Sequence, residues 1–237
     1  MDNGIFIREI KQVNIQGGFV IDGFPYAGLA NAIATESLIN TTAQFVLAGV
    51  LDSELFPPIS IIRDEKPGFP ARIFVNEELK VAVFSSYLTP HESLHREVAR
   101  CMLKWANDHK CSLIVSAAAV KNDEKPAVIG VATTDAARKK LADADIPVLK
   151  NGTVPGIPGI LLNEGSITDT NVIVLLYTGK ETGPDFRAGA EICMAVSKLV
   201  PGASCDLRTL MSEAENIESQ MKQAEEDAGP LRDAIYG

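Results

Sequence analysis

The sequence predicts an α/β domain in which helices flank a largely parallel, twisted sheet. Hydrophobic residues make up 46% of the 237 residues, whereas aromatic residues make up only 6%. A core rich in Val, Ile and Ala is typical of a sheet whose faces are covered by helices. From residue 90 onward, strand-like apolar runs alternate with helix-like segments, and this alternation favours parallel strands.

The first half of the chain contains mostly strand signals. Short apolar runs predict strands at residues 5–10, 18–21, 45–51 and 59–62. A hairpin is expected from residues 71–75 and 79–85, because Asn76, Glu77 and Glu78 separate two strand-like runs. Small and apolar residues at 27–39 predict a helix, in which Gly28 allows close approach to the sheet.

The second half alternates between strands and helices. Pro90 is expected to begin an amphipathic helix with Leu94, Val98, Cys101 and Trp105 on one face. Further strands are predicted at residues 113–118, 127–133, 146–149 and 172–177, and further helices at 135–144 and 184–199. Thr134 caps the first of these helices, and the Gly- and Pro-rich residues 152–159 are predicted to form a loop.

Residues 1–202 are predicted to form the α/β body, and residues 203–237 an acidic heptad helix with a short tail. Apolar residues recur at alternating spacings of three and four, which places on one helical stripe Leu207, Leu210, Ala214, Ile217, Met221 and Ala224. Ser204 caps this helix, and Gly229 with Pro230 ends it, so it is about 22 residues or roughly 33 Å long. The sequence leaves open whether the stripe packs on its own body or between subunits.

The composition argues against nucleic acid and anionic membranes as main partners. The formal net charge is −9, and nowhere do Lys and Arg cluster enough to neutralise phosphates. No apolar run reaches the roughly 20 residues that a membrane-spanning helix needs. The four cysteines, Cys101, Cys111, Cys193 and Cys205, lack paired spacing and are predicted to be reduced thiols. We therefore expect a soluble, cytoplasmic protein.

One motif points to metal chemistry. His91-Glu92-Ser93-Leu94-His95 has the spacing of a zinc peptidase, in which two histidines on one helix face bind zinc and the glutamate activates water. The motif follows Pro90 directly and so lies in the first turn of its helix, where ligands are poorly held. Val98 replaces the glycine of the longer metzincin motif, and no third ligand can be nominated. A solvent-exposed helix start is the preferred interpretation, and a zinc metallopeptidase is the lesser alternative.

Other catalytic patterns are incomplete. The loop at residues 152–159 offers backbone amides to a phosphate, but Pro155 and Pro158 have no N–H to donate. Residues 178–182 are similar to a phosphate-binding loop, yet Val174 occupies the position of its first glycine and Glu181 would repel phosphate. Ser116 ends a strand and is expected only to pack. We predict no catalytic residue, no cofactor and no metal.

Several segments resemble the proteasome assembly chaperone 2 family in its archaeal and actinobacterial branches. The glycine and proline positions that carry the resemblance lie at residues 23–28, 56–58, 156–162 and 183–188. Asn31 departs from the pattern, since a third glycine is expected there. The resemblance implies a fold similar to purine nucleoside phosphorylase, and homo-oligomeric assembly. A nucleoside-phosphorylase-like small-molecule enzyme stays open as an alternative on fold analogy.

The resemblance also gives a meaning to the end of the chain. Family members that end in a hydrophobic residue, tyrosine and any residue bind the proteasome α-ring, and this chain ends in Ile235, Tyr236 and Gly237. An aromatic ring buries a large area at little entropic cost, and a terminal carboxylate pairs with a cation or with backbone amides. The sequence therefore predicts a non-enzymatic assembly chaperone or activator-like protein whose partner is the proteasome α-subunits.

Overall fold

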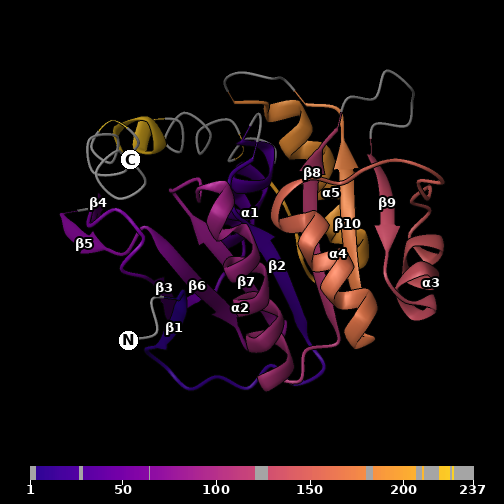
Figure 1. Cartoon of the computed structure of the whole chain (residues 1–237), viewed down its shortest axis with the longest axis horizontal. Helices are drawn as coiled ribbons and strands as arrows, with labels where there is room; N and C mark the ends of the chain where they lie inside the picture. Colours follow the sequence, from indigo (N-terminus) through magenta and orange to yellow (C-terminus); the bar gives the residue numbers. More distant parts are fainter. Residues whose placement is uncertain are drawn as a thin grey trace.

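The chain folds into three layers, in which one large sheet lies between two layers of helices (Figure 1). The structure is a computed structural model. It describes residues 4–26, 29–63, 65–120, 128–179, 184–206, 210, 219–224 and 226. The prediction of an α/β fold with a large sheet flanked by helices is confirmed.

The large sheet has eight strands in the order β1-β3-β6-β7-β2-β8-β10-β9. These strands are β1 (Phe6–Glu9), β2 (Phe19–Gly23), β3 (Val46–Asp52), β6 (Ala71–Asn76), β7 (Val81–Ser86), β8 (Leu113–Ala119), β9 (Val128–Ala132) and β10 (Val172–Tyr177). A separate two-stranded sheet is formed by β4 (Ile61–Arg63) and β5 (Lys66–Gly68).

The sheet is mixed, so the prediction of a largely parallel sheet is wrong for its outer strands. Among the strands that the structure describes, β7, β2, β8 and β10 are the ones that pair in parallel, and an isolated parallel bridge joins Gly130 of β9 to Val148. On one side β6 and β7 form the predicted hairpin, and β1, β3 and β6 continue it with antiparallel pairing. On the other side β9 pairs antiparallel with β10. Short connections such as the one between β6 and β7 impose antiparallel pairing, since a parallel neighbour needs a longer crossover.

Among the described residues, two helices cover one face of the sheet and three cover the other. The first face is covered by α2 (His95–Asp108) and α4 (Gly156–Thr168), which contribute Val98, Met102, Trp105, Ile157 and Leu161 to one apolar cluster. The second face is covered by α1 (Ala30–Thr41), α3 (Asp135–Asp143) and α5 (Phe186–Leu199). In Figure 1, α2 and α4 lie side by side in front of the sheet.

Helix α4 corrects the prediction of a loop at residues 152–159, because the helix already begins at Gly156. Its glycines and Pro158 are poor helix formers, which hid it in the sequence. The packing explains one of these glycines: a Cβ at Gly159 would lie 2.1 Å from the carbonyl oxygen of Val154. Pro158 lies in the first turn, where a missing N–H costs little.

The prediction of four reduced thiols is also corrected. Cys193 on α5 and Cys205 form a disulfide, with Cα atoms 6.1 Å apart across 12 residues of sequence. That separation suits a disulfide, and the turn at Pro201 and Gly202 brings the two residues together. Cys101 and Cys111 are free thiols, and burial raises the pKa of both, to about 11 and about 12 respectively.

The described part of the predicted heptad helix packs on the body of its own chain. Leu210, residues 219–224 and Glu226 are helical, and the other residues of the predicted helix lie outside the described ones. Leu210 and Met221 are buried in one cluster with Ala32 and Ile33 of α1 and with Tyr87. Of the two alternatives left open by the sequence, these contacts favour packing within one chain. Among the helices that the structure describes, none is long and apolar enough to cross a membrane.

Candidate functional site

Strands β2 and β8 pair over fewer residues than either strand contains. The two strands pair only where Phe19, Val20 and Ile21 face Leu113, Ile114 and Val115. Strand β2 continues to Gly23 along β7, and β8 continues to Ala119 along β10. Asp22 and Ser116 are the first residues after this pairing ends. Their side chains form a hydrogen bond there, where the backbones of β2 and β8 no longer pair. In open α/β sheets, ligands bind at the carboxyl ends of the strands, and the pairing of β2 with β8 stops at that end of the sheet.

Asp22 is the centre of a buried hydrogen-bond network at this position. Its Oδ2 accepts from Ser116 Oγ at 2.6 Å and from Tyr26 Oη at 2.8 Å. Its Oδ1 accepts from the Phe24 amide at 3.0 Å. Asn31 on α1 donates from Nδ2 to the backbone oxygen of Asp22 at 2.7 Å. The network therefore fixes the chain between β2 and α1.

Burial dominates the electrostatics of this network. Desolvation raises the pKa of Asp22 to about 6, although the three hydrogen bonds from Ser116, Phe24 and Tyr26 oppose the shift. Desolvation, and then the nearby Asp22 carboxylate, raise the pKa of Tyr26 well above its usual value. The Tyr26 phenol therefore keeps its proton and remains a hydrogen-bond donor to Asp22.

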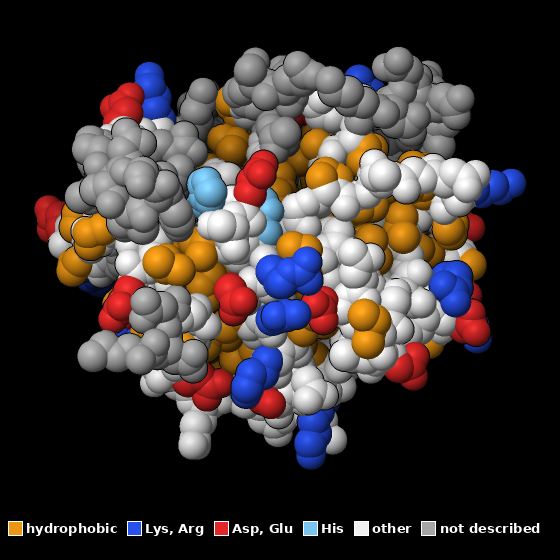
Figure 2. Space-filling view, in the orientation of Figure 1, with side chains coloured by type: hydrophobic (Ala, Val, Ile, Leu, Met, Phe, Trp, Pro, Cys, Tyr) orange, Lys and Arg blue, Asp and Glu red, His pale blue; other side chains and the backbone are white. Residues whose placement is uncertain are grey.

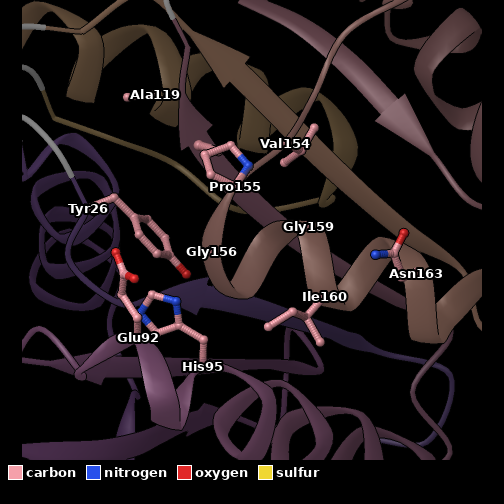
Figure 3. A pocket seen from close by; sticks show the side chains of 11 residues that line it. Tyr26, Glu92, His95, Ala119, Val154, Pro155, Gly156, Gly159, Ile160 and Asn163 are labelled. Carbon is pink, nitrogen blue, oxygen red and sulfur yellow. The ribbon is translucent and has the colours of Figure 1, made fainter.

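A cavity of about 610 Å³ opens beside Tyr26, between the amino-terminal ends of α2 and α4. Its polar lining includes Tyr26, Glu92, His95 and Asn163, and its apolar lining includes Val154 and Ile160. Figure 3 shows the Tyr26 hydroxyl, the Glu92 carboxylate and the His95 ring on one side of the start of α4, with Ile160 and Asn163 on the other. The volume is in the range of small-molecule sites, about 300–1,000 Å³.

The surface around the cavity carries paired charges. Arg96 and Arg100 of α2 both reach Glu164 of α4, at 3.3 and 3.2 Å. Figure 2 shows basic and acidic side chains together at the junction of α2 and α4, with histidine atoms and a carboxylate above them. None of the described residues that line the cavity is Lys or Arg.

The structure separates the residues of the zinc-peptidase motif. Residues Glu92–Leu94 form a 3₁₀ turn and α2 begins only at His95, so His91 and His95 do not share one helix face. His91 is exposed and its Nδ1 lies 2.9 Å from Ser93 Oγ, whereas His95 Nε2 lies 3.1 Å from the Pro90 carbonyl oxygen. Glu92 and His95 line the cavity. Within the described ranges, no three His, Cys, Asp or Glu side chains are grouped so as to hold a metal ion.

The remaining predicted sites have different outcomes. From residues 152–159, Val154, Pro155, Gly156 and Gly159 line the cavity. Most of residues 178–182, and the tail residues Ile235, Tyr236 and Gly237, lie outside the described residues.

Sequence reasoning missed Asp22 and Tyr26, and it expected Ser116 only to pack. The available signal was an aspartate inside the apolar run at residues 19–23, directly before the Gly23-Phe24-Pro25 turn. A buried carboxylate needs partners, so this position pointed to a polar network. Its partner Ser116 is 94 residues away in sequence, and only the fold brings the two together.

Comparison with known proteins gives one family and several similar folds. A sequence model of a protein family, described as the PAC2 family, matches residues 20–225. Pyrococcus furiosus PbaA, described as an archaeal homolog of proteasome-assembly chaperone, has a TM-score of 0.79 at 24% identity, covering 95% of this chain and 99% of that chain. Pyrococcus furiosus PbaB, described as an archaeal proteasome activator, has a TM-score of 0.69 at 22% identity, covering 94% and 99%.

A further solved structure is a PAC2 family protein from Streptomyces avermitilis, with a TM-score of 0.64 at 17% identity, covering 93% of this chain and 100% of that chain. At these identities the likeness to the three structures concerns the fold. No curated protein is significantly similar to this sequence. The family match is of a different kind, because it extends over residues 20–225 of 237, and the chain belongs to the PAC2 family.

Proposed function

We propose that this protein is a proteasome assembly chaperone or activator-like protein that docks its C-terminal tail between proteasome α-subunits. The observation that carries the proposal is the ending Ile235-Tyr236-Gly237 on a chain of the PAC2 family. The descriptions of PbaA and PbaB, whose folds are similar, agree with a proteasome-related role. The proposal assigns no catalytic step, cofactor or metal to the chain.

The chemistry of the tail suits a pocket between subunits. Ile235 and Tyr236 supply apolar area, and the tyrosine loses few rotamers on binding. The Gly237 carboxylate is an acceptor for a lysine or for backbone amides of the α-ring. A short terminal peptide of this kind binds weakly by itself, so the arrangement of several tails matters.

The body provides a base for the tail. Leu210 and Met221 are 1% and 3% exposed, and they pack against α1 and Tyr87, so the segment that leads to the tail is attached to the α/β body. We propose that the body forms homo-oligomers that present several tails to one α-ring. Linking weak contacts in this way raises the overall affinity by about 10²–10⁴ without any new contact.

The first experiment is co-sedimentation of the full chain with archaeal proteasome α-rings, compared with a chain that lacks residues 235–237. We expect only the full chain to bind, and Tyr236→Ala to weaken binding by about 30-fold or more, the cost of losing a buried aromatic anchor. Ile167→Ser is a matched control, because Ile167 is 81% exposed on α4 and lies far from the tail in sequence.

Light scattering on the shortened chain checks that the oligomer is intact, so that a loss of binding is assigned to the tail. Equal sedimentation of the full and shortened chains would remove the tail mechanism. Peptide hydrolysis by mature proteasomes, with and without the protein, then separates an activator from an assembly chaperone.

A further inference from the structure

We propose that the cavity between α2 and α4 binds a small organic primary amine in its protonated form. Tyr26, Glu92 and His95 each offer a hydrogen-bond acceptor to the cavity, and Val154 and Ile160 give it an apolar side. An ammonium group has three donors and no acceptor, so it fits such a set. This inference is independent of the tail and of the proposed proteasome partner.

The assignment of acceptors follows from the hydrogen bonds already made. Tyr26 gives its proton to Asp22 Oδ2 at 2.8 Å, so its oxygen acts only as an acceptor. The Ser116 hydroxyl also reaches this oxygen, and one lone pair remains for a ligand. His95 Nε2 lies 3.1 Å from the Pro90 carbonyl, which can only accept, so Nε2 carries the proton and Nδ1 is the acceptor. Nδ1 is also the nitrogen that lies towards Gly156, 3.8 Å from the position of a Cβ there.

Glu92 supplies the negative charge. Its side chain forms no hydrogen bond or ion pair with any residue that the structure describes, and it lines the cavity. The nearest arginines of α2, Arg96 and Arg100, are both paired with Glu164 and do not neutralise it. Asn163 likewise has no side-chain partner among the described residues, and Figure 3 shows its amide nitrogen nearer to Ile160 than its oxygen. Its carboxamide has both donors and an acceptor and carries no charge, so the preference for a cation rests on Glu92.

The amino-terminal ends of α2 and α4 act in the opposite direction. Each helix end carries about half a positive charge, which favours an anion. Two features reduce the effect of α4: Pro158 has no N–H, and the Gly159 amide is directed to the Pro155 oxygen at 3.4 Å. Glu92 and the Asp22 carboxylate, which accepts from Tyr26, together carry about two negative charges, against about one positive charge from the two helix ends. The balance therefore favours a cation over an anion.

The apolar wall selects the rest of the ligand. Val154 and Ile160 form one side of the cavity, and Ala118 and Ala119 at the end of β8 leave room beside them. A branched aliphatic group of about five carbons can contact both Val154 and Ile160, and each CH₂ that it buries contributes about 0.8 kcal/mol. Such a group fills only part of the 610 Å³ cavity, so larger amines of the same class also fit. The ligand class is thus an aliphatic primary amine.

The experiment uses three probes with the same aliphatic body and different head groups: isopentylamine, isopentanol and isovalerate. Dissociation constants are measured by saturation-transfer NMR on the full chain at neutral pH. We expect isopentylamine to bind at least about 5-fold more tightly than isopentanol, with isovalerate the weakest. Glu92→Gln should remove the preference for the amine and leave the affinity for isopentanol unchanged.

Glu97→Gln is the matched control, because Glu97 is exposed on α2, shortly after the 3₁₀ turn that contains Glu92, and does not line the cavity. The chain without residues 235–237 should bind isopentylamine as the full chain does, so failure of the tail proposal and failure of this one are distinguishable. The proposal is overturned if no probe binds, if isovalerate binds best, or if Glu92→Gln leaves the order of affinities unchanged.

Discussion

Asp22 offers the sharpest test of the buried network, because its ionisation is unfavourable inside the protein. The perturbation is Asp22→Asn, which keeps the shape of the side chain and removes its charge. The amide provides one acceptor oxygen in place of two, so the hydrogen bonds from Ser116 and Tyr26 are weakened by an amount that does not depend on pH. The pH dependence therefore isolates the charge of Asp22.

The magnitude follows from the pKa. Burial raises the pKa of Asp22 from 3.8 to about 6, and at about 1.4 kcal/mol per pKa unit this corresponds to about 3 kcal/mol. Between these two values the folded protein holds a proton that the unfolded chain releases. Stability of the wild type therefore falls relative to Asp22→Asn as pH rises from about 4 to about 6, and the difference is constant above that range.

The assay is urea unfolding of both proteins from about pH 5 to about pH 7.5. Over this range the difference in free energy of unfolding between wild type and Asp22→Asn should change by about 1.4 kcal/mol, about half of its total change with pH. Asp143→Asn is the control for the loss of a carboxylate as such, because Asp143 is exposed at the end of α3 and lies outside the Asp22 network. A difference between wild type and Asp22→Asn that is constant over this range would refute the reasoning.

Two further predictions concern stability. Gly159→Ala should lower the free energy of unfolding by about 2 kcal/mol or more, since its Cβ would lie 2.1 Å from the Val154 oxygen; Gly4→Ala, with no atom within 4 Å of the added Cβ, should leave urea unfolding unchanged. Reducing agent should lower the free energy of unfolding of the wild type by about 3 kcal/mol, because the Cys193–Cys205 bond is lost. The free energy of unfolding of Cys205→Ser should not change with reductant. An identical response of the two proteins to reductant would argue against the disulfide.

The elements with strong local patterns were predictable. Strand β10 is a continuous apolar run and is fully buried, as parallel strands covered on both faces are. The hairpin of β6 and β7 followed from two runs with a polar turn between them. Helix α3 begins where Thr134 caps it, with Oγ1 accepting from the Ala137 amide at 3.1 Å.

Features set by contacts between distant segments were not predictable. Gly156, Pro158 and Gly159 predicted a loop at residues 152–159, whereas they form the first turn of α4, in which Gly159 lies close to the Val154 carbonyl oxygen. The direction of β9 depends on its pairing with β10 and not on its own residues. The cavity joins Tyr26, Glu92 and Asn163 from three separate parts of the chain, and no local spacing connects them.

The short ladder between β2 and β8 has a mechanical consequence. Three residue pairs join them, whereas β7 pairs with β2 over five and β8 with β10 over six. The sheet thus consists of two parts, β1-β3-β6-β7-β2 and β8-β10-β9, and only the short pairing of β2 with β8 joins them among the described strands. Relative motion of packed elements concentrates where the fewest bonds must yield. On one face α2 packs on β7, where Trp105 lies edge-on to Phe84, and α4 packs on β8 and β10. A molecule held between the amino-terminal ends of α2 and α4 would therefore link the two parts of the sheet and oppose their relative motion.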